Sequence, residues 1–148
     1  MMPIKGHKIN CKFGVKGNMW SSGRHEGIDI ACPVGTEIVA PVDAKVEKVG
    51  QVWGGAFGHH NVLLKVEGGY LLFAHCSKAL VKAGDHVKMG QPIAKSGADG
   101  NVTGPHLHME YQKGPGWVKG GGLDPQKFLD AKPAAKKVAA PAAKPAAK

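Results

Sequence analysis

Short strand-like runs separated by turn residues constrain the fold of this chain more than any other feature. Each run has four to seven residues, is rich in β-branched, aliphatic or aromatic side chains, and is bounded by glycine, proline or aspartate. The runs lie at 36–40, 44–50, 61–66, 70–76, 86–89, 92–97 and 106–112. Runs this short and this close together predict an all-β fold, a single domain of mostly antiparallel strands with a β-sandwich-like layering.

Turn and cap residues give more local predictions. The sequence EGGY between 61–66 and 70–76 predicts a tight hairpin. Helix signals are weak: 76–84 predicts a turn or two at most, and DPQKFLDA at 124–131 predicts one short C-terminal helix after an Asp cap. We therefore expect the folded domain to span residues 1–130.

Composition restricts the class of protein. Hydrophobic residues at 43% and charged residues at 21% are usual for a soluble globular domain. No apolar run approaches the roughly 18 residues that cross a membrane, so we expect no membrane insertion. The first residues, MMPIKGHKINCKFG, contain no apolar segment typical of a secretory signal. We expect synthesis in a cytoplasm, and any target outside the cell would then need another route of release.

Residues 131–148 have a different composition from the rest. They read AKPAAKKVAAPAAKPAAK, with five lysines and no acidic residue. Their prolines interrupt any helix and they have little bulk to bury, which predicts a flexible, solvated, basic tail. The alternative is an electrostatic tether to a polyanion such as an anionic wall polymer. Basic and aromatic residues are not interleaved in 1–130, so we expect no specific nucleic-acid partner.

The three cysteines, Cys11, Cys32 and Cys76, exclude two kinds of site. Their odd number and the lack of a C-x-x-C spacing argue against a zinc finger and against a complete disulfide framework. We expect three reduced, buried thiols, with a bridge between Cys11 and Cys32 as the alternative.

The stretch TGPHLHME at 103–110 sets two histidines one residue apart. In a strand His106 and His108 share one face, while Leu107 and Met109 share the other. One interpretation is an exposed polar face on a half-buried strand. The other is a site in which both imidazoles act.

A second stretch, GRHEGIDI, places His25 and Asp29 four residues apart. On a straight strand they would lie about 13 Å apart, but Gly27 could supply a bend that brings them together. With one histidine of the HLH pair they would form a His₂-carboxylate set, which catalytic zinc uses with a fourth position open for water. His75, in LLFAHC, is either a partly buried histidine with a backbone partner or a further member of such a site.

The chain resembles the lysostaphin-like (LytM-type) zinc endopeptidases that cut peptidoglycan cross-links. The resemblance runs from about residue 20 to 112 and rests on HEGIDIACPVGTEIVAPVDAKV, on YLLFAHCS with VKAGDHVKMGQPIAKSG, and on TGPHLHME. It implies an antiparallel sheet with a groove for an extended peptide, and metal-assisted hydrolysis of an amide bond in the cross-linking peptide. It also implies one Zn²⁺ per chain bound by His25, Asp29 and His108, with His75 and His106 as the catalytic pair.

One departure and three competing readings accompany the resemblance. Family members often carry a tyrosine shortly before the first metal ligand, where FGVKGNMWSSGR offers only Trp20. The alternatives are a metal-free wall-binding or regulatory module of the same fold, a biotinyl- or lipoyl-like carrier, and a Cys–His hydrolase using Cys76 or another thiol. For His59 and His60 a plain loop is favoured over the rim of the groove.

We expect a monomer that acts as a phage endolysin, with a virion-carried peptidase as the alternative. Its substrate would be either a diaminopimelate cross-link or a glycine bridge.

Overall fold

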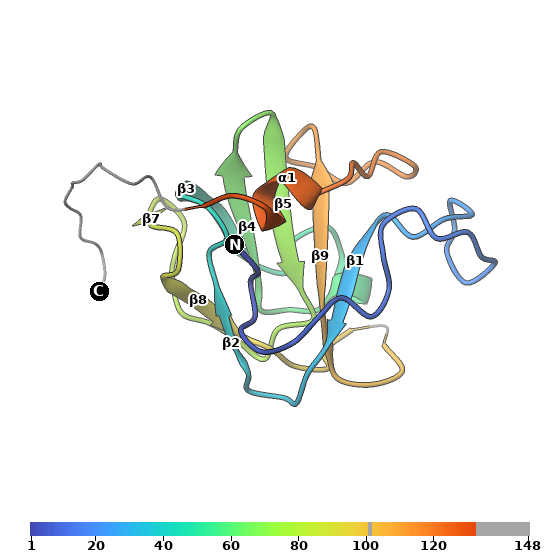
Figure 1. Ribbon diagram of the computed structural model, residues 1–148, viewed down its shortest axis with the longest axis horizontal. Coiled ribbons are helices and arrows are strands. Elements are labelled where there is room, and N and C mark those ends of the chain that lie inside the picture. The colour runs from blue at the N-terminus through green and yellow to red at the C-terminus, as the bar shows by residue number, and fades with distance from the viewer. Residues whose placement is uncertain (101, 133–148) are drawn as a thin grey trace.

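The computed structural model describes residues 1–100 and 102–132, so most of the predicted tail lies outside the described residues. Its main element is a six-stranded antiparallel sheet in the order β1-β9-β5-β4-β3-β7 (Figure 1). The strands of this sheet are β1 (Gly27–Ala31), β3 (Ala44–Gly50), β4 (Asn61–Val66), β5 (Gly69–Ala74), β7 (His86–Val87) and β9 (His106–Gln112). The longest predicted runs therefore form the centre of one sheet.

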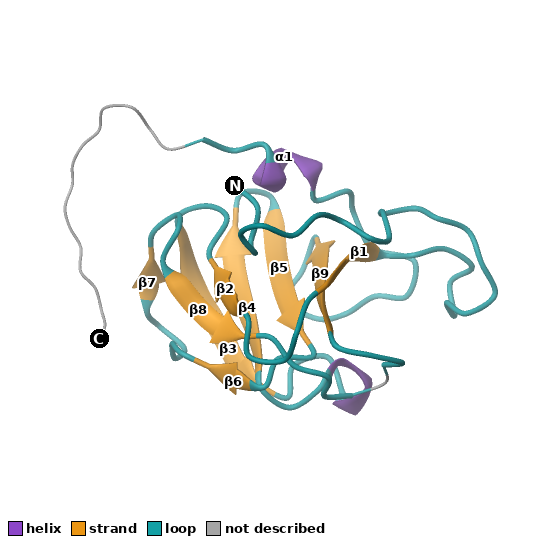
Figure 2. Cartoon of the chain, turned by 60° about the horizontal axis from the view of Figure 1, so that its bottom comes forward, coloured by secondary structure: helices purple, strands orange, loops and turns teal. Residues whose placement is uncertain are grey.

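A smaller antiparallel sheet packs on one face of the large one (Figure 2). Its strand order is β2-β8-β6, with bounds Glu37–Val39, Pro92–Lys95 and Lys78–Ala79. Two short helices complete the described chain: η1 (Gly55–Phe57) and α1 (Gln126–Leu129). No helix among the described residues is long and apolar enough to cross a membrane.

The main hydrophobic core lies between the two sheets. Alternate residues of β9, Leu107 and Met109, point into it, as does Phe73 of β5. Ile38 and Ile93 meet them from the small sheet, and all five are fully buried. The same alternation sends the intervening residues of β9 to the outer face of the large sheet.

That outer face has a second, smaller apolar cluster. Leu63 and Leu72 of the central strands pack there against Val52, with Trp53 and Phe57 at the edge of the cluster. The segment between β3 and β4 thus covers the outer face beside β9, and it forms one wall of the site described below.

Most of the predicted fold is confirmed. The ranges 44–50, 61–66 and 106–112 are strands, and the hairpin between β4 and β5 closes with Val66 opposite Gly69. The short C-terminal helix is present as α1.

Two local predictions were wrong. The stretch 76–84 contains no helix, because Lys78 and Ala79 pair with Lys95 and Ala94 as strand β6. The strand β1 was missed, because its glycine and aspartate weaken the strand pattern. Its two isoleucines nevertheless alternate inward around Asp29.

All three cysteines are free thiols. Cys32 and Cys76 are buried as expected, whereas Cys11 is only half-buried. The prediction of a buried Cys11 was therefore wrong: the N-terminal segment runs along the edge of β1, where one strand covers it on one side only.

Candidate active site

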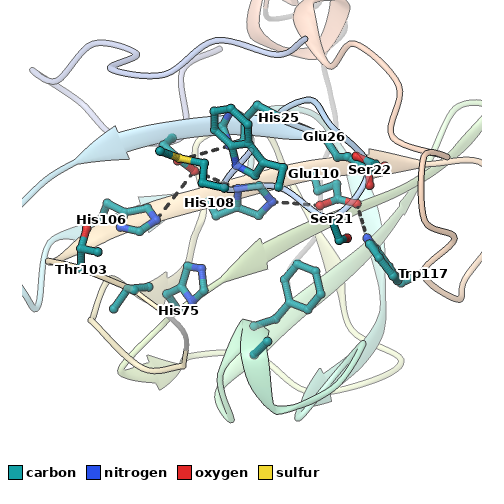
Figure 3. A pocket seen from close by; sticks show the side chains of 16 residues that line it. Ser21, Ser22, His25, Glu26, His75, Thr103, His106, His108, Glu110 and Trp117 are labelled. Carbon is teal, nitrogen blue, oxygen red and sulfur yellow. Dashed lines mark hydrogen bonds and ion pairs between the residues drawn. The ribbon is translucent and has the colours of Figure 1, made fainter. Parts of the chain in front are cut away.

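The pairing of β1 with β9 builds the centre of the site. Asp29 lies directly opposite His108 in this pair, so both side chains leave the outer face of the sheet at the same point. His106 and Glu110 leave the same face on either side of His108. Figure 3 shows His106, His108 and Glu110 around one cavity, which Asp29 also lines.

The carboxylate of Asp29 stands between two imidazoles. Its Oδ2 lies 3.2 Å from His25 Nε2, and its Oδ1 lies 2.8 Å from His108 Nδ1. His25 reaches this position because it precedes β1 rather than continuing it: its amide donates to the Val15 carbonyl, and its ring stacks on Trp20. The bend that the sequence required between His25 and Asp29 is therefore present.

The second nitrogen of each of these imidazoles is held by an acceptor. His25 Nδ1 bonds to the Lys12 carbonyl at 3.0 Å, and His108 Nε2 bonds to Glu110 Oε1 at 2.9 Å. An N–H at each of those nitrogens leaves His25 Nε2 and His108 Nδ1 with lone pairs facing the Asp29 carboxylate. Lone pairs that converge in this way repel one another unless a proton or a metal ion lies between them. The donor set fits a divalent cation such as zinc.

The electrostatics of the metal-free site agree with this reading. Burial opposes ionisation of Asp29, but hydrogen bonds from His108 and His25 outweigh it and lower the pKa of the carboxyl group. Burial also disfavours a charged His108, yet its bonds to Asp29 and Glu110 raise its pKa to about 9. The site therefore favours a positive charge, and in the metal-free protein a proton on His108 supplies it.

His75 and His106 lie beside this centre, with ring centroids 5.0 Å apart and ring planes tilted by 59° to each other. His75 Nδ1 donates to the Asp99 carbonyl at 2.8 Å, and His106 Nδ1 to the Gly104 carbonyl at 2.9 Å. Nε2 of His106 lies 3.7 Å from Asp29 Oδ1. Burial lowers the pKa of His75 to about 4, so this imidazole is neutral at pH 7.

All five residues singled out in the sequence line one cavity of about 360 Å³. Its walls also carry large apolar side chains from the segments before β1, between β3 and β4, and after β9: Met19, Trp20, Phe57 and Trp117. Trp20, the large ring that the sequence offers before His25 in place of a tyrosine, stacks on the His25 ring at a centroid distance of 4.9 Å. His59 and His60 are exposed and do not line the cavity, in agreement with a plain loop.

Three residues at the site were missed in the sequence. Glu110 is buried and accepts hydrogen bonds from His108, from Gln112 Nε2 at 2.7 Å and from Trp117 Nε1 at 2.8 Å. The strand alternation that paired His106 with His108 also predicts Glu110 on their face. Asp99 and Cys11 have no comparable local signal, since their roles depend on distant segments.

The thiols differ sharply in their surroundings. Cys76 is buried, its Sγ lies 3.3 Å from the Phe73 carbonyl, and burial raises its pKa to about 12. Such a thiol is a poor nucleophile, which argues against the Cys–His hydrolase. Cys11 instead lies with one donor atom each of His25 and Asp29, all three within 4.8 Å of one another. Burial, followed by the charge of Asp29, raises the pKa of Cys11.

Comparison with known proteins agrees with this geometry. The model of peptidase family M23 matches residues 23–125. The chain belongs to peptidase family M23. The matched range includes all five residues named above.

Relatives and solved structures support the same assignment. An uncharacterized metalloprotease of Haemophilus influenzae is 46% identical over 87 residues, which are 59% of this chain and 18% of that protein. The peptidoglycan DD-endopeptidase ShyC of Vibrio cholerae is 41% identical over 88 residues, 59% of this chain and 20% of that protein. This chain thus spans about a fifth of the length of these relatives. The catalytic domain of the antimicrobial peptidase lysostaphin from Staphylococcus simulans superposes with a TM-score of 0.73 at 30% identity, covering 84% of this chain and 93% of that one.

Proposed function

We propose that this M23 peptidase is a zinc-dependent endopeptidase that hydrolyses an amide bond in the cross-linking peptide of peptidoglycan. The observation that carries the proposal is the Asp29 carboxylate with one imidazole nitrogen facing each of its oxygens, at 3.2 and 2.8 Å. The peptidoglycan substrate is suggested by the name of the Vibrio relative. A metal-free wall-binding module has no need of metal-binding side chains, whereas His25, Asp29 and His108 are all present in this chain.

His25, Asp29 and His108 would hold the zinc through Nε2, a carboxylate oxygen and Nδ1. A zinc ion bound there would lower the pKa of a water molecule and polarise the scissile carbonyl. The Lys12 carbonyl and the Glu110 carboxylate keep the two imidazoles in the tautomer that ligation requires, because each accepts from the nitrogen that faces away from Asp29.

The two remaining histidines would handle protons and charge. His75 is neutral at pH 7 and its N–H at Nδ1 is held by Asp99, so Nε2 is the atom that accepts a proton from the attacking water. His106 lies beside it and would act as an imidazolium: its Nδ1–H stays bonded to the Gly104 carbonyl, while its Nε2–H donates to the oxygen on which negative charge develops. The proton on His75 would then pass to the leaving amine.

The cavity walls offer apolar surface to a peptide substrate. Trp20 precedes β1 and Trp117 follows β9, while the ring of Phe57, in the segment between β3 and β4, lies 6.0 Å from that of His108 and 6.1 Å from that of Trp117. These apolar walls would hold the aliphatic parts of an extended peptide, while the five polar residues act on its backbone.

Digestion of purified cell walls tests the proposal. Walls with diaminopimelate cross-links and walls with glycine bridges are each incubated with the protein, and new amino termini are identified by mass spectrometry. We expect cleavage in one of the two, lost on chelation and restored by zinc. New termini in neither wall type, or cleavage unaffected by a chelator, would contradict it.

Variants separate this proposal from a thiol enzyme. His25→Ala and Asp29→Ala should each lose the zinc and the activity, as measured by metal analysis of the purified proteins. Cys76→Ser should remain active, because its thiol is buried in the core. Activity that is lost in Cys76→Ser but insensitive to chelators would favour the Cys–His hydrolase.

A further inference from the structure

One row of side chains crosses three neighbouring segments on the outer face of the large sheet. Asp29 of β1 lies opposite His108 of β9 on one side, and opposite Cys11 of the N-terminal segment on the other. Residues directly opposite in an antiparallel pair place their side chains on the same face. Cys11 is therefore next to the proposed metal ligands, although it lies 14 residues before the first of them.

Backbone hydrogen bonds hold Cys11 beside Asp29 in this row. The amides of Asn10 and Cys11 both donate to the Asp29 carbonyl, at 2.8 and 3.3 Å, so two residues stand against one, as in a β-bulge. Bulges redirect side chains and are common next to active sites. The Asp29 amide returns a bond of 2.9 Å to the Cys11 carbonyl, which fixes the two residues against each other.

The thiol is close enough to share an ion with its neighbours. The Sγ of Cys11, a ring nitrogen of His25 and a carboxylate oxygen of Asp29 all lie within 4.8 Å of one another. Donor atoms around a tetrahedral zinc ion, with bonds of about 2.0–2.3 Å, are roughly 3.3–3.8 Å apart. A rotation of the half-buried Cys11 side chain would cover the difference.

We propose that Cys11 is a fourth, displaceable ligand of the metal held by His25, Asp29 and His108. The inference rests on the proposed function in that it takes those three residues as the metal site. On binding, the thiol would release its proton to solvent and bind as a thiolate. Together with the Asp29 carboxylate it would balance the charge of a divalent ion. The position that catalytic zinc keeps open for water would then be closed in the resting protein.

A closed fourth position makes the resting enzyme less active than its metal content implies. Removal of the thiol should raise the activity of the fully metal-loaded protein. If sulfur occupies the position in nine molecules of ten, the rise is roughly tenfold, the inverse of the competent fraction. The same removal should weaken metal binding, because one of four ligands is lost.

The test measures the metal's ligands directly. Wild-type protein is loaded with one equivalent of Co²⁺, and its near-ultraviolet spectrum is examined for thiolate-to-cobalt charge-transfer absorption. X-ray absorption of the zinc form should show one sulfur at about 2.3 Å. In Cys11→Ser both signals should vanish while one metal per chain is retained, with affinity at least tenfold lower in chelator competition. Cys32→Ala is the matched control and should keep both signals.

The outcomes distinguish this inference from the proposed function. One bound metal without a sulfur ligand in the wild type overturns the role of Cys11 and leaves the metallopeptidase intact. Persistence of the charge-transfer absorption in Cys11→Ser also overturns it. Failure of the wild type to bind either metal overturns both. The wild-type X-ray measurement needs no substitution, so it decides the matter even where Cys11→Ser folds poorly.

Discussion

The backbone carbonyl of Asp99 accepts a hydrogen bond of 2.8 Å from Nδ1 of His75. The loop that carries this carbonyl is tied to the segment before β4, because the Asp99 carboxylate accepts from the His59 amide at 2.8 Å. That hydrogen bond lowers the pKa of Asp99. His75 itself has a left-handed backbone, with φ of 63°, which is costly for a residue other than glycine. Asp99 thus acts as a positioning residue for His75.

We predict that Asp99→Ala lowers kcat by about tenfold, the lower end of the usual effect of residues that orient a site, while the metal content stays unchanged. The loss of the carboxylate frees the loop and leaves His75 Nε2 less well oriented. Steady-state kinetics with metal analysis would measure it. His59→Ala is the comparison: it removes the exposed Nδ1 contacts with the Asp99 carboxylate at 3.2 Å but keeps the backbone amide that donates to Asp99, so its loss should be clearly smaller. Equal losses in both variants would contradict the positioning role.

A second prediction separates proton transfer from ligation. His75→Ala and His106→Ala should each keep the metal and lose activity by about 10²–10⁴-fold, the usual contribution of a positioned acid–base group. Because the two imidazoles act in one step, the double variant should be less than multiplicatively worse. His108→Ala should lose metal and activity together. Loss of metal from His75→Ala would instead make His75 a ligand.

A third prediction concerns Glu110, which fixes His108 from behind. In Glu110→Gln the acceptor of the His108 Nε2 bond loses its charge, and the carboxylate no longer binds Trp117 and Gln112 as before. Metal affinity should fall by about 10–100-fold, as for other groups that orient a ligating imidazole. Chelator competition measures the change. Glu37→Gln, on an exposed position of β2, should leave affinity unaltered.

The sequence predicts the parts of this site that depend on strand periodicity. Once 106–112 is a strand, His106 and His108 must share a face, and the same rule places Glu110 beside them. The four-residue spacing of His25 and Asp29 is not sufficient by itself, because a straight strand would separate them. The bend arises from the contacts of His25 with Val15 and Trp20, and the choice of His108 over His106 as a ligand came from the family resemblance.

Contacts between distant segments carry no such local signal. Asp99 reaches His75 across 24 residues, and Cys11 meets Asp29 across 18, each through a backbone pairing that depends on the finished sheet. The strand β6 was missed for the same reason: only its pairing with β8 makes two residues of 76–84 extended. Pairing between distant segments therefore determines the parts of the fold and of the site that composition and residue spacing do not predict.

A fourth prediction concerns residues 133–148, which carry four lysines and no acidic residue. Their deletion should leave the melting temperature unchanged. The cut is placed after Lys132 because the Ala131 carbonyl accepts a bond from the N-terminal amine. Binding to whole cell walls should weaken at low salt and far less at high salt, since exposed charges are screened within ~10 Å at 0.1 M. Pull-down with wall preparations at two salt concentrations measures it, and equal binding with and without the tail would indicate a solvated segment only.

The last prediction follows from the proton that His108 holds in the metal-free protein. Its pKa is raised from 6.5 to about 9 in the folded state, since Asp29 and Glu110 both bond to the imidazole. Below about pH 6.5 both the folded and the unfolded chain are protonated there, and the stabilisation is fully present. As the pH rises from 6.5 through 9 this contribution is lost. The free energy of unfolding of the metal-free protein should therefore decline over that interval, as measured by urea denaturation in the presence of a chelator.

The free energy of unfolding of His108→Gln should decline less over the same interval, because this variant lacks the titrating group. The zinc-loaded wild type should also decline less, because the metal replaces the proton at Nδ1. Parallel declines in all three samples would show that His108 does not hold the proton.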